Sequence, residues 1–191
     1  MRRSAILLLV AIAAALVVVG GVAYAAAVTC TENPCLGTPE ADTIDGTEGP
    51  EKIKALAGND YVTAYGGNDT VYGDEGNDDV DAHSGNDTVY GGPDGDGTGG
   101  GTDFAMTNLE GAEGSDTVYG GGGNDWIDAA AHDTEGAVDH SYGGKGNDHI
   151  YAIDNNKDII NCGKGKGDVA LVDQEVGLDT TKGCEQVIVE D

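Results

Sequence analysis

The chain of 191 residues has very few basic side chains. Its only arginines are Arg2 and Arg3, so removal of the first 25 residues leaves seven lysines against 35 acids, a formal net charge of −28. Because contacts with phosphate need lysine and arginine, this balance excludes nucleic acid as a natural partner and disfavours anionic lipid. It favours cations, although a disordered acidic chain or a well-solvated surface would have the same composition.

Short catalytic and nucleotide-binding motifs are also missing. The sequence contains no H-E-x-x-H, G-x-S-x-G or Walker A pattern. The stretch from Asp94 opens like an EF-hand loop, but Ala105 stands where that loop needs a glutamate. We therefore expect no enzyme and no nucleotide partner, with a hydrolase of unrecognised active site as the remaining enzymatic hypothesis.

Long apolar runs are confined to the first 28 residues. Arg2 and Arg3 precede an unbroken apolar stretch at 5–19, and Ala-Tyr-Ala at 23–25 fits a signal-peptidase site. We expect a signal peptide at residues 1–25 and a secreted, extracellular protein, free or retained at the cell surface. An uncleaved membrane anchor is the alternative, because the stretch can be extended to Val28.

The four cysteines form two pairs that are local in sequence, Cys30 with Cys35 and Cys162 with Cys184. An even number in an exported chain indicates disulfides. Three connectivities are possible, and we favour the two nearest-neighbour bonds. A zinc site is the competing interpretation, but the two pairs flank the central region at opposite ends.

A nine-residue period begins at Gly37 and runs without a gap to residue 99. Units such as AYGGNDTVY (64–72) and AHSGNDTVY (82–90) have an acid at position six and an aliphatic residue at position eight. The register resumes at 111–128 and 143–151, after interruptions at 100–110 and 129–142. The position-six acids are Asp42, Glu51, Asp60, Asp69, Asp78, Asp87, Asp96, Asp116, Asp125 and Asp148.

Each unit combines a tight turn with a short strand. Glycine at position four permits a positive φ, and the three residues after the acid suit an extended strand whose middle aliphatic points inward. Because no unit can bury its own apolar side, successive units must coil into a solenoid. In the units with a complete Gly-x-Asp turn, the position-four glycines are Gly58, Gly67, Gly76, Gly85, Gly114, Gly123 and Gly146.

Stacked acidic turns would repel one another unless cations lie between the layers. Oxygen ligands favour a hard ion, calcium above magnesium. The alternative is a metal-free solenoid with ordinary Asn, Asp and Gly turns. The strict phase of the acid favours the calcium interpretation.

These units resemble the RTX (hemolysin-type) calcium-binding nonapeptide repeat, G-G-x-G-x-D-x-U-x. The resemblance covers about residues 37–99 and 111–151, and departs from the pattern where Ala55-Leu56, Ala64-Tyr65 and Ala82-His83 replace paired glycines. It implies a parallel β-roll with two units per turn, in which acids eighteen residues apart share one calcium ion with the turn carbonyls. The implied pairs are Asp60 with Asp78 and Asp69 with Asp87, followed by Asp42 with Asp60, Glu51 with Asp69, and Asp78 with Asp96.

The sequence thus predicts an all-β chain with four parts: a signal peptide (1–25), an N-terminal cap (26–36), a calcium-binding β-roll (37–151) and a C-terminal cap (152–191). Apolar stretches at 158–160, 169–172 and 187–189 should be the closing strands. One Val or Ile per unit makes a thin core, so we expect calcium to supply much of the folding free energy. The alternative function is calcium-dependent adhesion to a cell surface or an extracellular polymer.

Overall fold

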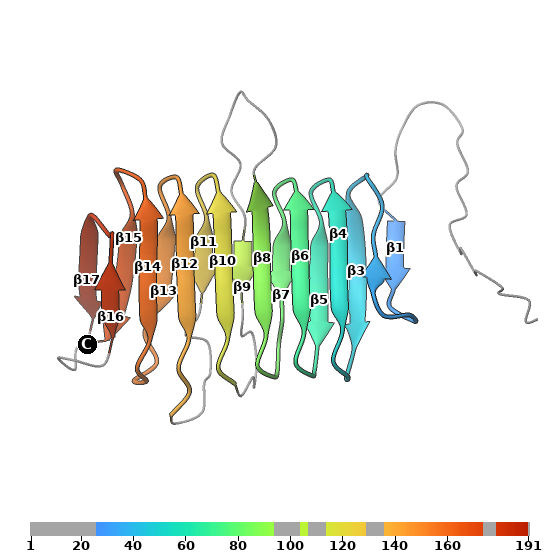
Figure 1. Cartoon of the computed structure of the whole chain (residues 1–191), viewed down its shortest axis with the longest axis horizontal. Coiled ribbons are helices and arrows are strands. Elements are labelled where there is room, and N and C mark those ends of the chain that lie inside the picture. The colour runs from blue at the N-terminus through green and yellow to red at the C-terminus, as the bar shows by residue number, and fades with distance from the viewer. Residues whose placement is uncertain (1–25, 94–103, 107–113, 129–135, 174–178, 191) are drawn as a thin grey trace, which may run out of the picture.

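The computed structural model describes residues 26–93, 104–106, 114–128, 136–173 and 179–190. Two sheets of parallel strands face each other along the length of the molecule, and the chain alternates between them as it coils (Figure 1). This is the all-β, parallel β-roll architecture that the sequence predicts. No helix within the described ranges is long and apolar enough to span a membrane.

Nine strands form one sheet, called sheet A, and eight form the other, called sheet B. Sheet A contains β1 (Ala26–Thr29), β3 (Asp42–Thr47), β5 (Tyr61–Tyr65), β7 (Asp79–Asp81), β9 (Phe104–Met106), β11 (Trp126–Asp128), β13 (His149–Ala152), β15 (Val169–Asp173) and β17 (Gln186–Glu190). Sheet B contains β2 (Cys35–Leu36), β4 (Lys52–Ala57), β6 (Thr70–Glu75), β8 (Thr88–Pro93), β10 (Thr117–Gly122), β12 (His140–Lys145), β14 (Ile159–Lys164) and β16 (Thr180–Lys182).

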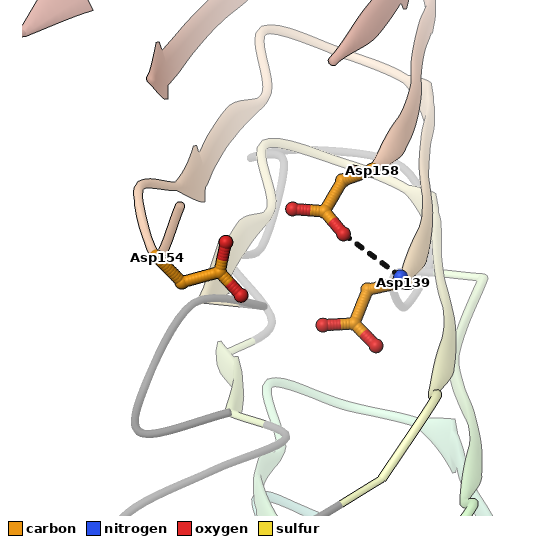
Figure 2. A group of neighbouring side chains, drawn as sticks. All are labelled: Asp139, Asp154 and Asp158. Carbon is orange, nitrogen blue, oxygen red and sulfur yellow. Dashed lines mark hydrogen bonds between the residues drawn. The ribbon is translucent and has the colours of Figure 1, made fainter. Parts of the chain in front are cut away.

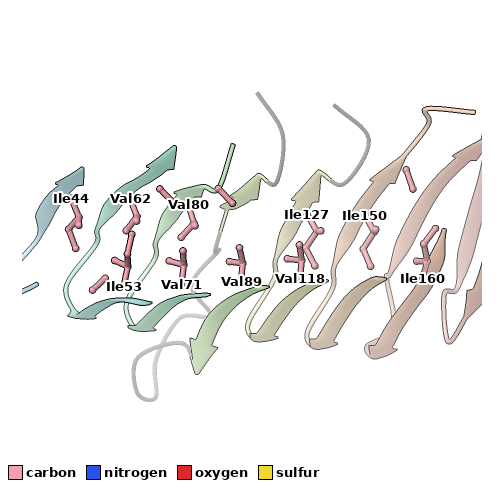
Figure 3. Close-up of a cluster of buried hydrophobic side chains, with 14 of the residues drawn as sticks. Ile44, Ile53, Val62, Val71, Val80, Val89, Val118, Ile127, Ile150 and Ile160 are labelled. Atoms are coloured by element: carbon pink, nitrogen blue, oxygen red, sulfur yellow. The ribbon is translucent and has the colours of Figure 1, made fainter. Parts of the chain in front are cut away.

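The core between the sheets consists of branched aliphatic side chains in two facing rows, one from each sheet, which together are called the buried column (Figure 3). It arises because the middle residue of each strand points inward while its two neighbours point outward. The inward residues are at most 1 % exposed, and small residues such as Ala55 and Ala64 fill the adjacent layer. The column consists of Ile44, Ile53, Val62, Val71, Val80, Val89, Val118, Ile127, Ile150 and Ile160.

Strand register survives both interruptions of the repeat. Val89 pairs with Val118 across the first, just as Val71 pairs with Val89 in the uninterrupted block. Two strands lie inside segments that the period marks as interruptions: β9 within 100–110, and the start of β12 within 129–142. The physical reason is that a strand of the roll needs only three extended residues with one inward position, so it can form without the glycine-rich turn before it.

Both ends of the roll carry the predicted disulfides. Cys30 is bonded to Cys35 and Cys162 to Cys184, and the four cysteines leave none for a zinc site. The three apolar stretches near the C-terminus form β14, β15 and β17, as predicted. The predicted signal peptide lies outside the described residues.

The turns depend on left-handed backbone at two positions. Position-four glycines such as Gly76 and Gly85 have φ of 141° and 142°. Where the second family glycine is replaced, Leu56, Tyr65 and His83 still adopt positive φ (88°, 72° and 61°), so the tight turn is kept. Each of these side chains stores roughly 1–2 kcal/mol of backbone strain, which packing and ligation must offset.

Replacing Gly85 by alanine should destabilise the roll by roughly 3 kcal/mol or more, because of overpacking and strain. A Cβ at Gly85 would lie 1.5 Å from the Gly67 carbonyl oxygen. Gly49→Ala is the matched control, since its Cβ would meet only Thr47 Oγ1 at 3.8 Å. Urea denaturation of the folded protein measures the difference, and similar midpoints for the two variants would contradict this account of the turns.

Candidate calcium-binding turns

A carboxylate closes each turn and links it to the preceding coil. The backbone N–H of Asp60 donates to Asp78 Oδ1 at 3.0 Å, and that of Asp69 donates to Asp87 Oδ1 at 2.8 Å. Acids eighteen residues apart are therefore brought together in adjacent coils. The four residues are at most 2 % exposed.

The same carboxylate ladder continues across the interruptions. Asp87 N–H donates to Asp116 Oδ1 at 2.7 Å, although the two residues are 29 apart in sequence. On the other side of the roll, Asp125 N–H donates to Asp148 Oδ1 at 3.0 Å across a separation of 23. Asp116, whose partner the period leaves open, thus continues the ladder of Asp69 and Asp87, and Asp125 and Asp148 form a ladder on the other side of the roll.

Five members of these ladders are missing from the sequence prediction. They stand one residue before the outward start of a strand, but without the Gly-Asn that marks the clear units. An acid followed two residues later by a small or aliphatic inward residue is the weaker signal that could have found most of them. The missing members are Asp139, Asp158, Asp168, Asp179 and Glu185.

Several carboxylates keep one oxygen without a hydrogen bond. Oδ2 of Asp60, Asp69, Asp87 and Asp168 is buried and accepts none. Burial raises the pKa of Asp60 and Asp69 to about 6 and that of Asp87 to about 7, and neighbouring carboxylates add to the shift. Burial likewise raises the pKa of Asp168. A buried anionic oxygen with no donor is costly on its own and suits a bound hard cation.

The first coil is arranged differently. Thr38 donates its backbone N–H to Asp42 Oδ2 at 2.5 Å and its hydroxyl to Asp42 Oδ1 at 3.0 Å. Thr47 likewise donates its backbone N–H, at 2.9 Å, and its hydroxyl to the two oxygens of Glu51. In both turns a threonine donates hydrogen bonds to both oxygens of the carboxylate. In the next coil the corresponding carboxylates, Asp60 and Asp69, each keep one oxygen that accepts no hydrogen bond.

Three carboxylates gather in one turn near the C-terminal end. Asp139, Asp154 and Asp158 offer oxygen atoms that all lie within 4.8 Å of one another (Figure 2). Asp139 and Asp158 are ladder members, joined by the Asp139 N–H bond to Asp158 Oδ1 at 2.8 Å. Asp154 approaches from the turn before β14, so this turn contributes a side-chain carboxylate of its own.

The remaining predicted positions can be placed as follows. Six of the seven turn glycines have positive φ, whereas Gly114 does not. A Cβ at Gly114 would nevertheless lie 1.6 Å from the Gly85 carbonyl oxygen, so the close approach is kept. Asp96 lies outside the described residues. Opposite Asp79 of β7 the register places Phe104 rather than a residue of unit 91–99.

Comparison with known protein families supports calcium as the bound ion. The model of the RTX calcium-binding nonapeptide repeat (4 copies) matches residues 36–70, 45–80, 63–97, 107–132 and 134–156, more than half of the chain. The chain therefore belongs to this family, and its β-roll is of the calcium-binding kind. Comparisons with curated proteins and with solved structures found no match.

Asp87→Asn should weaken calcium binding in the Asp87 turn at least tenfold. Loss of a charged ligand should cost at least as much affinity as loss of a group that only supports a ligand, which typically costs about 10- to 100-fold. The amide oxygen can still accept the Asp69 N–H, so the coil itself should be retained. Asp45→Asn is the matched control, since Asp45 lies on the outer side of β3 and is not in the ladder. Isothermal titration calorimetry with calcium compares them, and equal losses would show that only overall charge matters.

Proposed function

We propose that this chain is an exported, non-catalytic calcium-binding β-roll whose folding is coupled to calcium. The observation that carries the proposal is the set of buried carboxylate oxygens that accept no hydrogen bond in Asp60, Asp69, Asp87 and Asp168. When bound there, calcium supplies positive charge and accepts oxygen ligands in place of water. The protein's own part is to hold those oxygens in register through the N–H bonds of the ladder.

The balance of forces supports this coupling. Each coil buries only one branched aliphatic side chain from each unit, worth roughly 1.5–3 kcal/mol, whereas ordering the backbone of the nine residues in that unit costs roughly 1–2 kcal/mol for each residue. Stacked carboxylates add repulsion to that cost. Metal binding can then contribute folding free energy outright.

The proposed ligands are Asp60, Asp69, Asp78, Asp87, Asp116, Asp125 and Asp148, joined by Asp139, Asp158 and Asp168. Asp154 would add a third carboxylate beside Asp139 and Asp158. Asp42 and Glu51 differ, because Thr38 and Thr47 already occupy their oxygens. The calcium ladders of both sheets thus begin in the second coil, behind a hydrogen-bonded N-terminal cap.

Circular dichroism titrated with calcium, magnesium and EDTA tests the coupling. The purified protein without calcium should lack most of its β signal, and calcium at about 10⁻⁴–10⁻³ M should restore it, as in other extracellular calcium modules. Trp126, which stacks on His149 at 5.6 Å, reports the same transition by fluorescence. An identical β spectrum in EDTA and in calcium would rule out coupled folding.

Glu51→Gln should leave the number of bound calcium ions unchanged, whereas Asp69→Asn in the next coil of the same sheet should lower it. The reason is that the oxygens of Glu51 are held by Thr47, while Oδ2 of Asp69 accepts no hydrogen bond. Equilibrium dialysis counts the ions. A matching loss of calcium in both variants would place an ion in the first coil after all.

A further inference from the structure

The outer surface of sheet B carries two lanes of outward side chains with no acid in either, from β4 to β16. Each lane runs across the strands. The first lane consists of the residue that precedes the inward residue of each strand, and the second consists of the residue that follows it. The first lane is Lys52, Thr70, Thr88, Thr117, His140, Ile159 and Thr180. The second lane is Lys54, Tyr72, Tyr90, Tyr119, Tyr142, Asn161 and Lys182.

This surface differs from the opposite one. The strands of sheet A contain no lysine, and their outward positions include Asp45, Asp79 and Asp128. The strands of sheet B contain five of the chain's lysines, and their only acids are Asp74 and Glu75, both beyond the two lanes at the end of β6. In a chain with formal charge −26, two neighbouring lanes of outward side chains without acids are an electrostatic exception.

Stacked tyrosines determine what this face offers to a partner. The rings of Tyr72, Tyr90, Tyr119 and Tyr142 follow one another at centroid distances of 4.8, 5.0 and 4.7 Å, with interplanar angles of 12°, 3° and 9°. Their faces cover one another, so the ladder leaves ring edges and hydroxyl groups for a partner. Stacking of a neutral sugar or a nucleic-acid base on these rings is thereby disfavoured.

Positive charge and hydrogen-bond donors border the ladder. The Nζ atoms of Lys52 and Lys54 lie 4.7 and 5.1 Å from the centroid of the Tyr72 ring. Tyrosine hydroxyls are donors at neutral pH, and desolvation, together with Tyr142 and Tyr90, raises the pKa of Tyr119 further. Lys182 lies at the far end of the same lane.

We propose that the outer face of sheet B binds a linear anionic polysaccharide of low charge density, with Lys52, Lys54 and Lys182 pairing with its acid groups and the tyrosine and threonine hydroxyls donating to its oxygens. The inference rests on the proposed function, because the two lanes align only in the calcium-folded roll. A small anion could meet only one end of the face, whereas a polymer spans it.

A densely charged polymer fits less well. Duplex DNA carries one negative charge per about 1.7 Å of its axis. The overall negative charge of the protein would repel such a polymer strongly. A polysaccharide with widely spaced carboxylates meets weaker repulsion and brings hydroxyl groups that can pair with the tyrosine and threonine lanes.

The probe is hyaluronan, titrated by calorimetry into the protein in calcium, with dextran as the neutral polymer and duplex DNA as the dense one. Lys52→Gln/Lys54→Gln should weaken hyaluronan binding about tenfold, from the loss of two exposed charge pairs. Lys157→Gln/Lys166→Gln removes the same charge from exposed turns and should leave binding unchanged. Tyr90→Phe/Tyr119→Phe keeps the ring stack and should weaken binding several-fold.

Three results would overturn the assignment: equal effects of the two lysine pairs, equal binding of dextran, or tighter binding of DNA than of hyaluronan. Circular dichroism of each protein in calcium separates the two levels of failure. If the β signal forms in calcium but hyaluronan does not bind, only the polysaccharide surface is wrong. If no calcium-dependent β signal forms, the proposed function fails as well.

Discussion

Burial of a carboxylate in most of the described turns is the constraint on which the rest of this structure depends. Asp60, Asp69 and Asp87 each lie against the backbone of the previous coil, where one oxygen accepts an N–H and the other is shielded from water. Such a stack is unfavourable without compensation, because burial and mutual repulsion both oppose ionisation. In the proposed function, calcium in the turns removes this penalty, and the thin column of Val and Ile then suffices to orient the two sheets.

The regular part of the chain could be predicted from its sequence. Between residues 55 and 90 the nine-residue period is unbroken, so the positions of Asp60, Asp69, Asp78 and Asp87 and of the inward valines follow from it. The pairing of acids eighteen residues apart follows from the resemblance to the RTX repeat. Beyond residue 90, the separations between ladder partners change to 29, 23 and 19. Because the number of residues between successive strands varies, no fixed period reveals where a coil resumes, and the nine-residue period therefore misses Asp139 and Asp158.

The first coil shows another limit of sequence patterns. Asp42 and Glu51 are in phase with the calcium acids, yet the threonines four residues before them hold their oxygens. Phase identifies the place of a carboxylate but not its partner, which depends on how the preceding residues fold back. The same holds for the tyrosine ladder, since its stacked geometry and the charge difference between the two faces emerge only when the coils are in register.

The N–H bond from each ladder acid to the acid of the next coil also has a kinetic consequence. An ordered coil presents a preformed N–H to its successor, so addition of one coil to an existing stack costs less entropy than starting a new one. In the proposed function, the hydrogen-bonded turns of Asp42 and Glu51, which follow the Cys30–Cys35 disulfide, provide such a start without an ion. Under that proposal the roll is a one-dimensional zipper with its nucleus at one end, and successive ions would enter cooperatively as the zipper closes toward the C-terminus.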